Sequence, residues 1–247
     1  MVVRHTPLGH DIDGTSFDSV LVQDDSSPPN PSTVLVLHGM EGRSDAQLQF
    51  AERLTEWGYQ AIAVDLFGAE VTRGGMAATS AAMTAFVGDR DALARRLDAV
   101  YAALTNEPQV DPARVAAIGF CFGGLCVLDL ARAGHALTGV AAFHGLLTAP
   151  HRPSDGPVTA RIAVYHGWDD PYAPPEDVVA LGRELSGRDI DWQLHAYGNT
   201  MHAFMAPWAA DPQRGIQYSE AAARRAWTSL RYFLEECFGA EVQATDR

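Results

Sequence analysis

Short runs of apolar residues recur along the chain, and they limit most narrowly how it can fold. Each run has the length of a β-strand rather than of a helix, and almost every side chain within it is apolar. Strands of a parallel sheet show this pattern, because helices cover both faces of the sheet. We therefore predict buried strands at residues 34–37, 61–64, 115–118, 140–143 and 162–165. Two further segments predict a strand at 192–197 and an edge strand at 17–23.

Segments with helical periodicity separate these runs. Ser44-Asp45-Ala46-Gln47 has the pattern of a capping box and predicts a helix that turns Phe50, Leu54 and Trp57 inward and ends at Gly58. Apolar residues at helical spacing predict three more helices: one through Leu93–Leu104, one from Pro174 to Gly187, and one from Ala223 to Cys237.

The alternation of strands and helices predicts an α/β fold, with a mostly parallel sheet flanked by helices on both faces. No linker or repeat divides the 247 residues, so we expect one domain spanning residues 1–247. The stretches 24–32 and 148–157 are predicted to be loops. Ligands of such a sheet bind beyond the carboxyl ends of its strands, so motifs at those ends are the candidates for function.

The charge of the chain excludes several classes of partner. The chain holds 18 Lys and Arg against 31 Asp and Glu, a formal net charge of −13. Such a surface repels nucleic acid phosphates and anionic lipid headgroups, so neither nucleic acid nor membrane is expected as a partner. Three cysteines are too few for a disulfide framework, and the first residues lack the apolar core of a secretory signal. We expect a cytoplasmic protein.

One predicted strand runs directly into a sharp turn that carries a cysteine. Residues 115–118 are followed by Gly119-Phe120-Cys121-Phe122-Gly123-Gly124, and a helical segment then extends from Leu125 to Ala133. This spacing is that of the nucleophile elbow, G-x-S-x-G, with cysteine in place of serine. Side chains at the flanking glycines would crowd the neighbouring strand and helix. A helix N-terminus beside the sulfur favours the thiolate, so Cys121 is the candidate nucleophile.

The other two cysteines lack this context. Cys126 falls inside a helical segment and Cys237 on an apolar helical face, so both are interpreted as core residues.

A thiol nucleophile needs a base and a group that orients the base, and elbow hydrolases supply them in the order nucleophile, acid, histidine. The strand at 162–165 leads to Asp169 and Asp170, and the strand ending at Tyr197 leads to a loop with His202. Among nine histidines, only His202 combines the right order with a loop position. His38, His144 and His166 end strands and are interpreted as pocket or core residues.

With these motifs the chain resembles the dienelactone hydrolase family of α/β-hydrolases. The resemblance runs from about Val34 to the C-terminal helix. Its carriers are Gly-Phe-Cys-Phe-Gly-Gly at the elbow, Gly-Trp-Asp-Asp-Pro-Tyr-Ala-Pro-Pro at the acid, Met-His-Ala-Phe at the histidine, and Leu66-Phe67-Gly68. It implies a Cys121–His202–Asp170 triad, with Asp169 as the second candidate for the acid. Its pattern also selects the N–H groups of Met40 and Phe122 as the oxyanion hole.

Two departures from the family concern activation and substrate. Founding members carry a glutamate at the position of Gly39, and Glu41 is a candidate replacement. They also carry an arginine shortly after the catalytic histidine, whereas here Met205, Ala206, Pro207 and Trp208 follow, with no basic residue before Arg214. We therefore expect a preference for neutral esters or lactones, unless Arg73 reaches the site. The further pocket candidates are Glu41, Phe67, Arg73, Phe120, His144 and Tyr172.

The leading hypothesis is thus a cysteine hydrolase of carboxylic esters or lactones, a monomer or homodimer without cofactor or metal. An acyltransferase or cyclase on the same scaffold, or a binding protein without catalysis, is the alternative. A glutamine amidotransferase would pair the cysteine with His-x-Glu, but Phe204 stands two residues after His202. Neither a G-x-G-x-x-G dinucleotide fingerprint nor metal-ligand spacing is present.

Overall fold

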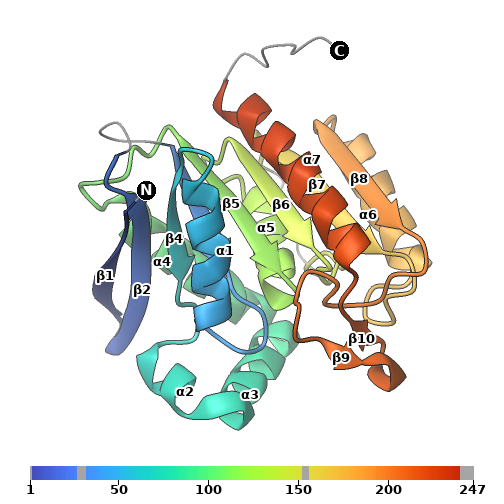
Figure 1. Ribbon diagram of the computed structural model, residues 1–247, viewed down its shortest axis with the longest axis horizontal. Coiled ribbons are helices and arrows are strands. Elements are labelled where there is room, and N and C mark those ends of the chain that lie inside the picture. The colour runs from blue at the N-terminus through green and yellow to red at the C-terminus, as the bar shows by residue number, and fades with distance from the viewer. Residues whose placement is uncertain (1, 27–31, 152–155, 240–247) are drawn as a thin grey trace.

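An eight-stranded sheet forms the centre of the computed structural model, which describes residues 2–26, 32–151 and 156–239 (Figure 1). Its strands lie in the order β1-β2-β4-β3-β5-β6-β7-β8. The bounds are β1 (Val3–Ile12), β2 (Thr15–Asp24), β3 (Thr33–Leu37), β4 (Gln60–Val64), β5 (Val115–Phe120), β6 (Gly139–Phe143), β7 (Arg161–Gly167) and β8 (Trp192–Tyr197). The pairs β1–β2 and β2–β4 are antiparallel, and the six strands β4, β3, β5, β6, β7 and β8 run parallel to one another. The predicted mostly parallel sheet is confirmed.

Helices cover both faces of this sheet (Figure 1). The helices α1 (Asp45–Thr55) and α7 (Glu220–Phe238) pack on one face, and α4 (Arg90–Thr105), α5 (Phe122–Arg132) and α6 (Pro175–Gly187) pack on the other. Along β3, Val34 and Val36 face α1 and α7, whereas Leu35 and Leu37 belong to the opposite core. Burial of alternate side chains on opposite faces explains why these strands read as continuous apolar runs.

The edge of the sheet differs from the prediction. The segment predicted as an edge strand is β2, which pairs on both sides, and the edge itself is β1. Half of the residues of strand β1 are exposed, and Leu8 is its one buried residue. Without an apolar run, the sequence pattern offered no sign of this strand.

The start of α1 also departs in part from the predicted capping box. Ser44 caps the helix, since its hydroxyl accepts a hydrogen bond from the Gln47 amide at 3.5 Å. The Gln47 side chain does not return to the cap. It donates to the carbonyls of Val36 and Val64, the latter at 3.1 Å, and so joins the ends of β3 and β4. The buried amide nitrogen of Gln47 thereby finds two acceptors at the carboxyl end of the sheet.

Two segments near this end contain elements that were not predicted. The short helix α2 (Ala69–Arg73) and the helix α3 (Gly75–Gly88) follow β4. A hairpin of β9 (Ala210–Asp211), the 3₁₀ turn η1 (Pro212–Arg214) and β10 (Ile216–Gln217) follows β8. The predicted loops 24–32 and 148–157 lie partly outside the described residues, and Asp24 still belongs to β2. None of the described helices has the length and apolar content needed to cross a membrane.

Candidate active site

Cys121 occupies the turn between β5 and α5, in a strained backbone conformation. Its φ of 55° and ψ of −114° lie in a region that side chains other than glycine rarely adopt. The Cys121 amide donates to the carbonyl of Phe143 on β6 at 3.0 Å, and its carbonyl accepts from the Gly124 amide at 3.0 Å. Helix α5 begins at Phe122, three residues before the sequence indicated, so the thiol lies directly at its N-terminus.

Two glycines around Cys121 leave the space that the turn needs. A Cβ atom on Gly119 would lie 2.0 Å from the carbonyl oxygen of Gly123, and one on Gly123 would lie 2.3 Å from that of Leu37. Both distances are far below van der Waals contact with backbone that cannot move freely. The predicted reason for the elbow glycines is therefore confirmed.

His202 and Asp170 meet beside this turn. Asp170 follows β7 and His202 follows β8, and the His202 Nδ1 atom lies 2.7 Å from the Asp170 Oδ2 atom. The other carboxylate oxygen of Asp170 accepts a hydrogen bond from the Tyr172 amide at 2.9 Å. Both side chains are buried. Asp169, the second candidate for the acid, is exposed and does not contact the imidazole in this way.

The electrostatics of His202 favour its protonated form. Burial by itself lowers the pKa of an imidazole, but hydrogen bonds with Asp170 and Cys121 and the charges of both outweigh burial, and they raise the pKa of His202 to about 10. A protonated His202 can give a proton to a leaving group in the cavity that it lines with Cys121.

The β9–β10 hairpin holds the His202 loop in place. The His202 amide donates to the Gly215 carbonyl at 2.9 Å, and the Gln217 amide donates to the His202 carbonyl at 3.0 Å. The Tyr172 ring packs edge-on against His202, with centroids 4.9 Å apart, and its hydroxyl donates to the Arg214 carbonyl at 3.2 Å. The loops of the acid and of the histidine are thus joined through this hairpin.

The amides predicted to form an oxyanion hole come from two segments. Phe122 is the first residue of α5, and Met40 follows β3. Within the described part of the chain, neither amide donates a hydrogen bond. The buried His38 orders the Met40 segment, because its Nδ1 atom contacts the Gly39 carbonyl at 2.8 Å and its Nε2 atom accepts from the Leu66 amide at 3.1 Å. His38 is therefore a structural residue beside the site.

The Glu41 carboxylate occupies the space that a side chain at Gly39 would fill. A Cβ atom on Gly39 would lie 2.7 Å from the Glu41 Oε2 atom and 3.4 Å from the Cys121 Cβ atom. The glycine at this position therefore leaves room for a carboxylate that reaches back from two residues further along the chain.

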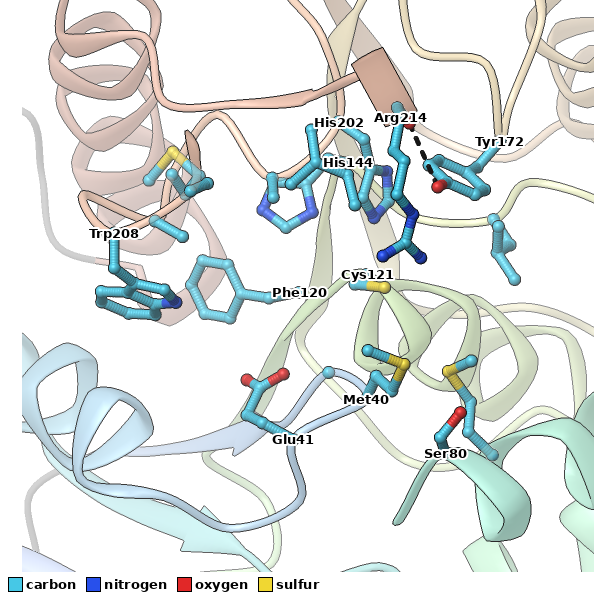
Figure 2. A pocket seen from close by; sticks show the side chains of 18 of the residues that line it. Met40, Glu41, Ser80, Phe120, Cys121, His144, Tyr172, His202, Trp208 and Arg214 are labelled. Atoms are coloured by element: carbon cyan, nitrogen blue, oxygen red, sulfur yellow. Dashed lines mark hydrogen bonds between the residues drawn. The ribbon is translucent and has the colours of Figure 1, made fainter. Parts of the chain in front are cut away.

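Cys121 and His202 line a cavity of ≈ 390 Å³ at the carboxyl end of the sheet (Figure 2). Four of the six pocket candidates line it: Glu41, Phe120, His144 and Tyr172. The other two do not. Phe67 packs beneath the site against His38 and Phe122, and Arg73 is an exposed residue at the end of α2.

The wall of the cavity also contains residues that the sequence did not suggest. Ser80 and Met83 come from α3, and Arg214 and Ile216 come from the hairpin. Figure 2 shows the Arg214 guanidinium pointing towards Cys121. The alanine-rich composition of 75–88 was a sign of α3, but nothing local indicated that Arg214 folds back over the site. From the sequence, Arg73 alone was expected to be an arginine that could reach the site, and this expectation is wrong, because Arg214 lines the cavity and Arg73 does not.

His144 lies against His202 with its ring centroid 5.0 Å away. Burial and the neighbouring His202 hold the pKa of His144 well below its usual value, so it is a neutral wall residue. His166, the other strand-end histidine, is fully buried behind the site, and burial lowers its pKa as well. Among the described residues, no group of three or more His, Cys, Asp or Glu side chains could hold a metal ion.

The strand order, the cysteine on the β5–α5 turn, and the acid and histidine after β7 and β8 define an α/β-hydrolase. Residues 17–238 match the model of the dienelactone hydrolase family, so the chain belongs to that family and is an ester or lactone hydrolase.

Three similar proteins illustrate the range of the likeness. A dienelactone hydrolase-like promiscuous phosphotriesterase from metagenomic libraries is 32% identical with a TM-score of 0.89, over 96% of this chain and 99% of that one. An uncharacterized protein of Caenorhabditis elegans is 36% identical over 150 residues, which are 58% of this chain and 92% of that protein. A thermophilic esterase of Thermogutta terrifontis has a TM-score of 0.65 at 13% identity, over 97% of this chain and 95% of that one, and shares the fold alone.

Proposed function

We propose that the protein hydrolyses small carboxylic esters or lactones through a triad of Cys121, His202 and Asp170. The observation that carries this proposal is the position of His202, which contacts Asp170 at 2.7 Å through Nδ1 and lines the same cavity as Cys121. One imidazole joined to a carboxylate and to a nucleophile is the arrangement that activates an acyl-transfer enzyme.

In the first half of the proposed reaction the Cys121 thiolate attacks the carbonyl carbon of the substrate. The resulting oxyanion accepts hydrogen bonds from the Met40 and Phe122 amides. As the tetrahedral intermediate collapses, the bond to the leaving oxygen breaks, and the His202 imidazolium gives its proton to that oxygen. The alcohol leaves, or the lactone ring opens, and a thioester remains on Cys121.

The second half returns the enzyme to its resting state. Neutral His202 takes a proton from a water molecule as the water attacks the thioester carbon. The same two amides stabilise the second oxyanion, and its collapse releases the carboxylic acid and the Cys121 thiolate. Asp170 stabilises the imidazolium in both halves and fixes the ring orientation.

The direct test is to isolate the acyl-enzyme. Mass spectrometry of the protein quenched during turnover of a 4-nitrophenyl ester should show an acyl adduct on the peptide that contains Cys121. The adduct should be absent from the Cys121→Ala variant. Turnover without any adduct on that peptide would contradict the mechanism. If thioester transfer to an added alcohol or amine exceeds hydrolysis, the protein is an acyltransferase instead.

A second activity is supported by the similarity to the promiscuous phosphotriesterase, which extends over nearly the whole chain at 32% identity. The thiolate that attacks a carbonyl carbon can also attack phosphorus and expel an aryl oxide, which leaves a phosphorylated cysteine. Incubation with paraoxon should therefore release 4-nitrophenol and label Cys121. Release that persists in Cys121→Ala would exclude this route.

A further inference from the structure

A second cavity of ≈ 380 Å³ lies next to the active-site cavity, between α1, the start of α7 and the segment after His202. We call it the distal cavity. It shares Phe50, Met205 and Trp208 with the active-site cavity, so these side chains line both cavities. Its remaining wall includes Arg53, Glu220, Arg224 and Trp227.

Aromatic rings connect the nucleophile to the distal cavity. Phe120, the residue before Cys121, stacks on Phe50 with centroids 4.3 Å apart. Phe50 in turn contacts Trp208 at 6.4 Å and Trp227 at 5.7 Å. Trp208 is 56% exposed although it is large and apolar. These rings form a continuous apolar path on which a chain or ring of a substrate can lie.

The far end of this path is positively charged. The Arg53 guanidinium lies 4.6 Å from the centroid of Trp227, and Arg224 lines the same cavity. Within the described part of the chain, neither arginine forms an ion pair. A cation held over a ring keeps its N–H groups available to an anion. Among the described residues, Glu220 is the one acidic residue that lines this cavity, so two cations accompany one carboxylate in a protein whose net charge is −13.

We propose that the distal cavity binds the remote end of the substrate, and that this end is an anionic group, such as a carboxylate, carried on an apolar chain or ring. The inference rests on the proposed hydrolase function, because it places the scissile ester at Cys121 and the rest of the molecule along Phe120, Phe50 and Trp208. The guanidinium groups of Arg53 and Arg224, which form no ion pair with any described residue, favour a carboxylate, which they can hold through charge-assisted hydrogen bonds.

The test compares two esters of equal acyl length. 4-Nitrophenyl octanoate ends in a methyl group, and mono-4-nitrophenyl suberate ends in a carboxylate. We expect kcat/KM to favour the suberate, and we expect Arg224→Gln to lower the suberate-to-octanoate ratio by about tenfold, mainly through KM, since it removes a charged hydrogen bond. Arg53→Gln should lower the same ratio. Arg225→Gln is the matched control, because Arg225 is the next residue on α7, is exposed and does not line either cavity.

Several outcomes would overturn the proposal. One is an equal effect of Arg224→Gln and Arg225→Gln on the ratio. Another is a suberate preference that is abolished by Arg214→Gln and unaffected by Arg53→Gln and Arg224→Gln, which would place the carboxylate in the active-site cavity instead.

A binding measurement separates this proposal from the proposed function. Monomethyl suberate titrated into the Cys121→Ala variant should quench tryptophan fluorescence, and Arg224→Gln in that background should weaken its affinity. Failure of the wild-type protein to hydrolyse 4-nitrophenyl acetate would count against the proposed function alone. Absence of Arg224-dependent binding would count against the distal site alone.

Discussion

The Nδ1 atom of His202 lies 2.7 Å from the Oδ2 atom of Asp170, although 32 residues separate the two in the chain. The contact exists because β7 and β8 are adjacent and parallel, so that the loops after both strands emerge at the same edge of the sheet. Hydrogen bonds from the β9–β10 hairpin then fix the His202 loop from the other side.

Replacement of Cys121 by alanine should abolish most of the activity. We expect kcat/KM to fall by about a thousandfold or more, as when nucleophiles of other triads are removed. The control is Cys126→Ala, because Cys126 is fully buried within α5, where burial raises the pKa of its thiol. Steady-state kinetics on 4-nitrophenyl acetate should show this control within a few-fold of wild type. Equal losses in the two variants would remove Cys121 from the role of nucleophile.

Asp170→Asn should cost far more activity than Asp169→Asn. An asparagine cannot stabilise the imidazolium and favours the wrong tautomer of His202, so we expect kcat to fall by roughly 10⁴-fold. Asp169 is exposed, and its substitution should leave kcat within about twofold, as usual for surface positions. Steady-state kinetics on both variants checks this. If the Asp169 variant proved the more impaired, Asp170 would not be the acid of the triad.

The stability that His202 contributes should depend on pH. Its pKa rises from an ordinary value of 6.5 to about 10 in the folded state, where hydrogen bonds with Asp170 and Cys121 overcome burial. A raised pKa means that folding favours the protonated form, so the stabilisation is complete below the unfolded value and is lost as pH rises through the folded value. Asp170→Asn should therefore lower Tm by more at pH 6 than at pH 10. Thermal unfolding at both pH values tests this, and an equal deficit at the two would contradict it.

Arg214 should matter for small anionic substrates. Its guanidinium lines the active-site cavity, and its ion pair with Asp211 is long, at 3.9 Å. A carboxylate close to the scissile ester can replace that partner, so Arg214→Gln should lower kcat/KM for mono-4-nitrophenyl malonate relative to its methyl ester by about tenfold. Arg73→Gln, on an exposed residue outside the cavity, should leave this ratio unchanged. If Arg73→Gln lowered the ratio and Arg214→Gln did not, Arg73 would be the residue that binds the carboxylate.

The elbow should tolerate no side chain at Gly123. An alanine Cβ would lie 2.3 Å from the Leu37 carbonyl oxygen, so β3 and α5 must separate, and we expect a loss of about 1–3 kcal/mol or more in the free energy of unfolding. Gly88→Ala is the control, because a Cβ at that position meets no atom within 4 Å. Urea unfolding of both variants measures the difference. A Gly123 variant as stable as the Gly88 variant would show that the elbow relaxes easily.

The sequence by itself determined the central strands and the elbow. Both are local patterns: a strand buried on two faces must be apolar at every position, and the β5–α5 turn leaves no room for a side chain at Gly119 or Gly123. Chain order also pointed to His202, since the strand-to-loop pattern located it after β8. Strand β1 was not predicted, because its residues form no apolar run.

Only the tertiary structure decided which charged side chains face the cavity. Asp169 and Asp170 are neighbours in the chain, and the turn after β7 buries one against His202 and exposes the other. Arg73 and Arg214 are equally basic, but α2 carries the first away from the cavity, while the hairpin, tied to Tyr172 and His202, carries the second over it. A local sequence pattern indicates the periodicity of apolar residues in a segment and therefore which of its faces is buried. The direction of a side chain in a loop depends on hydrogen bonds between segments far apart in the chain, which no local pattern contains.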